Sequence, residues 1–203
     1  MHLSEQDRER ISTAIRSAEA RTSGEIVCVL AQASTDATAL PVLLAALVSL
    51  VLPWLLVAFT AMSVRRILLL QVIVFFALAA VLCLPRVRIA LVPRAARRAV
   101  AHRAAIEQFF IRGIARKKDR SGVLIFVSLA EHYARVIADE GIAARVPPSQ
   151  WQEVVDTLVA HIRNDRVVDG FIAAIELCGN TLSTNFPPTD SSRDELPDRI
   201  YLI

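Results

Sequence analysis

The sequence predicts an α/β domain that is interrupted by a two-helix transmembrane hairpin. Three observations lead to this fold class. Two long apolar runs lie close together between residues 39 and 84. Short β-branched runs and amphipathic helical patterns lie on both sides of them. The stretch from Ala37 to Ile106 holds eight Arg and no Asp or Glu, so the net positive charge lies in the insert and its exit. The net charge of +3 is therefore not a nucleic-acid signal, and no nucleic-acid partner is expected.

The two apolar runs are predicted to be membrane-spanning helices. Residues 39–64 carry no charge, and residues 67–84 contain Gln71 as their one strongly polar side chain. A spanning helix needs about 20 apolar residues, within a range of about 17–25. Because Arg65-Arg66 is the only break between the runs, the helices are expected to be antiparallel. Two buried helices of a soluble core are the alternative, but a chain of this size has little material to cover both.

The arginines orient the hairpin. Arg65 and Arg66 lie at its tip, whereas the exit flank is richer in positive charge and includes Arg86, Arg88, Arg94, Arg97 and Arg98. Excess positive charge stays on the cytoplasmic side. The sequence therefore predicts a multi-pass protein of the inner (cytoplasmic) membrane, without a cleavable signal peptide, whose termini and soluble domain are cytoplasmic.

The segment before the hairpin predicts one helix and one strand. Ser4 and Asp7 form a capping-box pattern, and Ile11, Ile15 and Ala18 follow at helical spacing. Residues 25–30 are a β-branched run bounded by turn residues, which is typical of a strand.

The segment after the hairpin supplies the rest of the domain. It predicts a helix over 94–118, a strand over 123–129 and a second strand over 133–138 that forms a hairpin with the first. A helix capped by Ser149 and a second apolar stripe over 168–182 follow. The strand 25–30 is expected to join this sheet. The predicted organisation is thus one α/β domain in two parts (1–36 and 93–186), a hairpin (37–92) and an extended or mobile tail (187–203).

Three carboxylates are the candidate site. Asp139 and Glu140 follow a strand, and Asp169 opens a later helix. Together they could hold a hard cation such as Ca²⁺ or Mg²⁺ through oxygen atoms. Solvated turn acids and helix-start acids are the more ordinary interpretation of the same residues. The sequence establishes no cofactor and contains no P-loop, GxGxxG, GxSxG or HExxH motif.

The soluble elements resemble the TPM domain family. The resemblance lies in residues 18–27 (AEARTSGEIV), 121–128 (SGVLIFVS), 137–142 (IADEGI) and 169–175 (DGFIAAI). It implies a Rossmann-like α/β/α sandwich with a small central sheet. It also implies membrane attachment, because the family includes bacterial membrane proteins, and roles that range from photosystem repair and receptor accessory subunits to an acid phosphatase activity in a plant relative.

Two functions follow as hypotheses. The first is a non-catalytic accessory or interaction module of a membrane complex, which contacts the lipid bilayer and a membrane-protein partner. The second is a metal-assisted, phosphatase-like hydrolase that uses Asp139, Glu140 and Asp169. The anchor and the lack of a nucleophile–base set favour the first.

Overall fold

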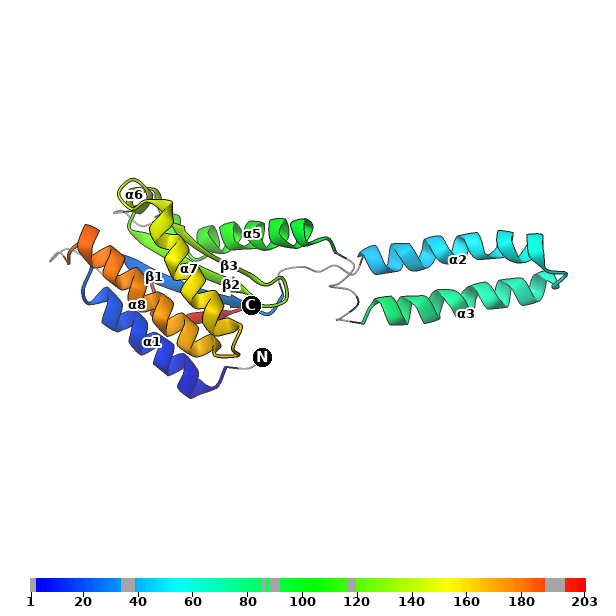
Figure 1. Ribbon diagram of the computed structural model, residues 1–203, viewed down its shortest axis with the longest axis horizontal. Coiled ribbons are helices and arrows are strands. Elements are labelled where there is room, and N and C mark those ends of the chain that lie inside the picture. The colour runs from blue at the N-terminus through cyan, green and yellow to red at the C-terminus, as the bar shows by residue number, and fades with distance from the viewer. Residues whose placement is uncertain (1–2, 34–38, 85–86, 88–91, 117–119, 189–195) are drawn as a thin grey trace. The chain divides into compact units, whose positions relative to one another are not determined.

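The computed structural model describes residues 3–33, 39–84, 87, 92–116, 120–188 and 196–203. The chain divides into two compact units, one formed by residues 1–34 and 98–203 and the other by residues 35–97. Within the described residues the first unit contains a four-stranded sheet, and the second contains two long apolar helices (Figure 1).

The sheet has the strand order β3-β2-β1-β4. Its strands are β1 (Glu25–Ala31), β2 (Gly122–Ser128), β3 (Tyr133–Ala138) and β4 (Ile200–Leu202). β1 is parallel to both β2 and β4, whereas β2 and β3 are antiparallel. The predicted β2–β3 hairpin and the predicted pairing of the N-terminal strand with it are confirmed.

Helices cover both faces of the sheet, as predicted. In β1, Cys28 and Leu30 point into one core, whereas Val27 and Val29 point into the other. The first core packs against α1 (Glu5–Glu19), α7 (Pro148–Ile162) and α8 (Val167–Asn185). The second packs against α5 (Arg94–Ile111), which contributes Ala105 and Phe109. β1 and β2 are buried along their full length because they are central and covered on both sides.

Local chemistry accounts for most helix ends and corrects two predictions. Ser4 and Asp7 form the predicted capping box of α1. The predicted helix 94–118 ends earlier, at Ile111, because Gly113 adopts a φ of 77° that stops the helix, and the 3₁₀ turn η1 (Ile114–Arg116) follows. Ser149 is not the cap of α7: Pro147 holds that position and Pro148 is the first helical residue, where its missing N–H costs nothing.

The second unit is a pair of helices, α2 (Ala39–Phe59) and α3 (Val64–Leu82), which pack against each other. Pro41, Ala45 and Ser49 lie buried at four-residue spacing on α2, so small side chains line its contact with α3. The turn between the helices is Thr60–Ser63, not the predicted Arg65-Arg66. Both arginines lie in the first turn of α3, where the Ser63 carbonyl accepts from the N–H groups of residues 66 and 67.

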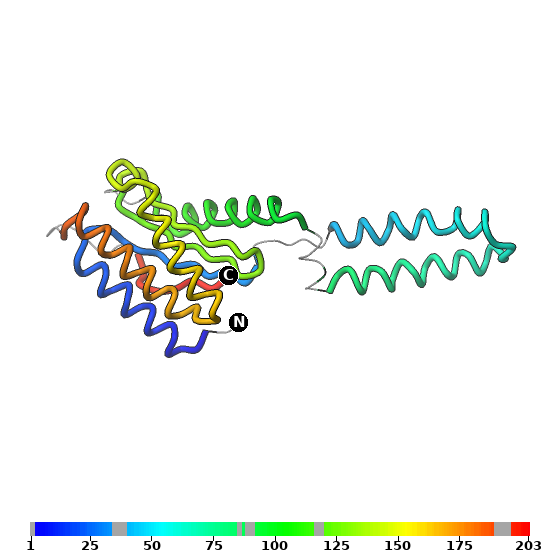
Figure 2. Tube along the Cα trace, viewed as in Figure 1, coloured from blue at the N-terminus to red at the C-terminus, as the bar shows by residue number. Residues whose placement is uncertain are grey.

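The C-terminal tail contains a strand that the sequence prediction did not include. β4 pairs with Cys28–Leu30 of β1, and Figure 2 shows this last segment, in red, beside the blue β1. The Ile203 N–H donates to the Leu30 carbonyl at 3.1 Å, which extends the ladder. The tail therefore closes one edge of the sheet.

Candidate functional site

Asp139 and Glu140 lie where β3 ends and the short helix α6 (Glu140–Ala143) begins. The Asp139 N–H donates to the Gly122 carbonyl, and its Oδ1 accepts from the Glu140 N–H at 2.7 Å, so Asp139 caps α6. Its second carboxylate oxygen is buried without a hydrogen bond among the described residues. Glu140 forms an ion pair with Arg120. The geometry is that of a helix cap joined to a turn.

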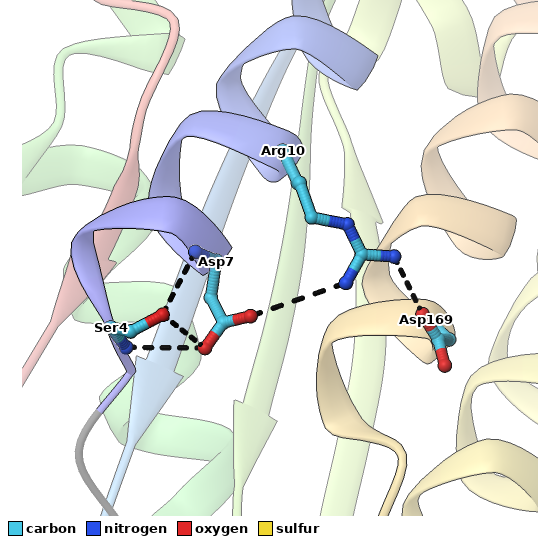
Figure 3. Close-up of polar contacts among 4 residues, drawn as sticks. All are labelled: Ser4, Asp7, Arg10 and Asp169. Carbon is cyan, nitrogen blue, oxygen red and sulfur yellow. Dashed lines mark hydrogen bonds and ion pairs between the residues drawn. The ribbon is translucent and has the colours of Figure 1, made fainter.

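Asp169 lies in the first turn of α8 and contacts α1. Arg10 donates from Nη2 to Asp169 Oδ1 at 2.9 Å, and its Nη1 lies 4.0 Å from Asp7 Oδ1 (Figure 3). Hydrogen bonds from the Ser4 side chain and backbone, together with the charge of Arg10, lower the pKa of Asp7. The Arg10 and Asp169 side chains are 55% and 44% exposed, so this pair aligns the two helices with a contribution below about 1 kcal/mol.

The three predicted site carboxylates do not form one metal site. Asp139 and Glu140 adjoin α6, at the start of α7, whereas Asp169 follows the end of α7 (Figure 1). The 15 residues of α7 correspond to about 22 Å of helix. Among the described residues, no group of three His, Cys, Asp or Glu side chains could hold a metal ion. The donor set required for a shared Ca²⁺ or Mg²⁺ is therefore split between two ends of the domain.

A shallow groove runs between α1 and α8. Its volume is about 580 Å³, and its lining includes Arg10, Arg21, Glu9 and Glu176. The Arg21 guanidinium donates to Asn180 Oδ1 at 3.1 Å, which ties the two helices together at one end of the groove. Because both signs of charge are present, the groove does not select an anion or a cation.

A half-buried pair of carboxyl groups was missed by the sequence prediction. Glu19 at the end of α1 accepts a hydrogen bond from the Ile26 N–H at 2.6 Å and lies close to the carboxyl group of Asp198, which precedes β4. Burial, reinforced by the charges of Asp198 and Glu25, raises the pKa of Glu19 from 4.5 to about 9. Glu19 follows Ile15 by four residues, on the buried side of α1, and an acid at such a position was the available signal. The pair joins α1, β1 and β4, which makes it a structural contact.

The outer surface of the α2–α3 hairpin is the most distinctive functional feature of the described residues. Its windows of highest hydropathy are only 11% and 6% buried, and the helices are long and apolar enough to cross a membrane. Large side chains such as Trp54, Phe59 and Val64 are at least 71% exposed. Transfer of one such side chain out of water is worth about 1.5–3 kcal/mol, so the whole surface represents on the order of tens of kcal/mol. This exceeds the net stability of a typical domain, so removal of this surface from water is strongly favoured.

The described members of the predicted set of orienting arginines lie in the first turns of two helices. Arg65 and Arg66 lie in the first turn of α3, and Arg94, Arg97 and Arg98 lie in the first turns of α5. Arg86 and Arg88 lie outside the described residues.

Comparison with known proteins supports the predicted resemblance. The TPM domain family model matches residues 85–181, which include α5, β2, β3, α7 and most of α8.

One solved structure with the same fold is the NMR structure of the BA42 protein from the psychrophilic bacterium Bizionia argentinensis. It aligns with a TM-score of 0.62 and 19% identity over 100% of this chain and 97% of that chain. At this identity the likeness concerns the fold alone. No curated protein matches the sequence.

Proposed function

We propose that the chain is a membrane-anchored TPM domain that acts as a non-catalytic accessory or interaction module of a membrane complex. The exposed apolar surface of the α2–α3 hairpin carries this proposal. A lipid bilayer about 30 Å thick accommodates helices of 20 and 19 residues, at a rise of 1.5 Å per residue, without further protein. The anchored domain then presents its helices to other proteins at the membrane.

Crosslinking in native membranes tests the accessory role. A photo-reactive amino acid is placed at Thr13 on α1, Gln150 on α7 or Phe110 on α5, which are exposed positions on three helices. We expect at least one position to form a defined adduct with a membrane protein. Adducts with lipid alone, or none, at all three positions would contradict the accessory role and leave the anchoring intact.

We infer further that the hairpin lies in the inner membrane with both termini in the cytoplasm. The support is the larger number of arginines at its exit, where Arg94, Arg97 and Arg98 follow the second helix, than at its tip, which has Arg65 and Arg66. In this orientation the TPM domain is cytoplasmic.

A native cysteine provides the test of orientation. Cys83 caps α3 and is exposed, whereas Cys28 and Cys178 are fully buried, and burial raises the pKa of both buried thiols. A membrane-impermeant maleimide added to intact cells is expected to leave Cys83 unlabelled until the cells are opened. In the Cys83→Ser background, Ser63→Cys at the tip should react from outside. The reverse pattern would contradict the assigned orientation.

A further inference from the structure

Gln71 is a polar side chain near the middle of an apolar helix. It is the eighth of the 19 residues of α3, and no other strongly polar side chain lies between Ile67 and Leu82. At about 1.5 Å per residue, Gln71 lies about 10 Å from the start of the helix. In a membrane-spanning hairpin this depth is inside the hydrocarbon region.

The described hydrogen bonds within the hairpin involve the backbone of Gln71 and not its side chain. Ser49 on α2 donates from Oγ to the backbone carbonyl of Gln71 at 3.1 Å, and Ser49 is 4% exposed. The Gln71 side-chain amide is only partly buried and makes no hydrogen bond within the described residues. Gln71 and Ser49 line a hollow of about 380 Å³ on one side of the hairpin, and the rest of its wall includes Leu68, Val72, Phe75 and Phe76.

An amide in hydrocarbon needs a hydrogen-bonding partner, because no water is present at that depth. The side chain of Gln71 carries both a carbonyl acceptor and an NH₂ donor, so two such amides can satisfy each other. A second copy of the chain supplies its amide at the same depth by symmetry. A two-fold contact repeats the same patch on both copies, so the apolar walls of the two hollows also meet.

We propose that this hollow is the docking site for the hairpin of a second copy of the chain, with the two Gln71 amides hydrogen-bonded across a two-fold axis. The inference rests on the proposed membrane anchoring. It assigns a specific partner to the intramembrane part of the interaction module, and it makes the anchor a recognition element as well as a tether.

The test measures dimerisation of the full chain in liposomes over a range of protein-to-lipid ratios. A fluorophore on Cys83 reports association by single-molecule photobleaching, since the other two cysteines are buried. We expect Gln71→Leu to weaken dimerisation by roughly 5- to 10-fold, as expected for the loss of two interhelical hydrogen bonds in lipid. Gln71→Asn keeps an amide and should restore most of the association.

Matched controls separate the hollow from a general effect of polarity. Ile73 is 65% exposed and lies outside the hollow. Ile73→Leu is expected to leave dimerisation unchanged, and the double variant Gln71→Leu/Ile73→Gln, which moves the amide off this side of α3, should not restore it. Restoration by the double variant would overturn the assignment of the hollow.

The remaining outcomes distinguish failure of docking from failure of anchoring. A chain that resists alkaline carbonate extraction but stays monomeric, or whose Gln71→Leu variant dimerises like the original, overturns docking and leaves anchoring standing. A crosslink from the hollow to a different membrane protein alone also overturns the second copy as occupant. A chain that carbonate releases from the membrane overturns both proposals.

Discussion

Replacement of Glu19 by Gln is expected to stabilise the folded domain at neutral pH. The carboxyl group of Glu19 accepts a hydrogen bond from the Ile26 N–H and lies close to Asp198, and its pKa is raised from 4.5 to about 9, chiefly by burial. Between these values the folded chain holds a proton that the unfolded chain has released. Stability therefore falls as pH rises from about 4.5 to about 9, by at most about 1.4 kcal/mol per pH unit.

The size of the effect follows from this window. pH 7.5 is three units above the unfolded-state pKa of 4.5, so by that pH the free energy of unfolding has fallen by at most about 4 kcal/mol. A Gln side chain keeps an oxygen that accepts from the Ile26 N–H, and its NH₂ group can donate to Asp198. The amide does not titrate, so its contribution to stability does not change with pH. Arg16 forms an ion pair with Asp198 and so offsets part of the negative charge near Glu19. We therefore expect Glu19→Gln to raise the free energy of unfolding by about 1–3 kcal/mol at pH 7.5 and to make it less dependent on pH.

The assay is urea unfolding of the full chain in detergent micelles at pH 5.5 and 7.5. Trp151 on α7 is 8% exposed and reports on the domain core in a Trp54→Phe background. Glu9→Gln is the matched control, because Glu9 lies on the same helix with its side chain 74% exposed, and it should change stability by less than about 0.5 kcal/mol. Destabilisation by Glu19→Gln at pH 7.5, or an unchanged pH slope, would refute the reasoning.

Two further predictions concern packing and the candidate carboxylates. In Gly179→Ala, the added Cβ would lie 2.8 Å from Ala18 Cβ between α1 and α8, so we expect a loss of about 1–3 kcal/mol in thermal or urea unfolding. At Gly113, φ is 77° and no atom lies within 4 Å of an added Cβ, so Gly113→Ala should lower the free energy of unfolding by only about 1 kcal/mol. A greater loss for Gly113→Ala than for Gly179→Ala would contradict the packing account. Asp169→Asn should cost less than about 1 kcal/mol, because its pair with Arg10 is exposed. Millimolar Ca²⁺ or Mg²⁺ should leave the melting temperature of the original chain unchanged, and a shift that Asp169→Asn abolishes would show a metal site there.

The elements with strong local patterns were predictable. The apolar run of β2 and the short run of β3 that follows a tight connection contain their own signals, and the structure places the strands within a residue of the prediction. The predicted position of the turn between α2 and α3 was wrong by a few residues. A pair of arginines marks a break in hydropathy, but arginine is a good helix former and both residues fit the first turn of α3.

Features that depend on distant pairing were not predictable. β4 is three residues long and is a strand only because β1 offers it a partner. The Glu19–Asp198 pair joins residues far apart in sequence, and its components resemble ordinary surface acids. Among the candidate carboxylates, Asp139 and Glu140 are consecutive in the sequence, whereas the length of α7 separates Asp169 from them.

Quenching of Trp54 by brominated lipids tests membrane insertion of the hairpin most directly. Trp54 lies within α2 and is 80% exposed, so in a spanning helix its ring contacts acyl chains. In liposomes that contain the Trp151→Phe chain, we expect bromine atoms deep in the acyl chains to quench Trp54 strongly and aqueous acrylamide to quench it weakly. Strong acrylamide quenching with no effect of brominated lipid would contradict the account.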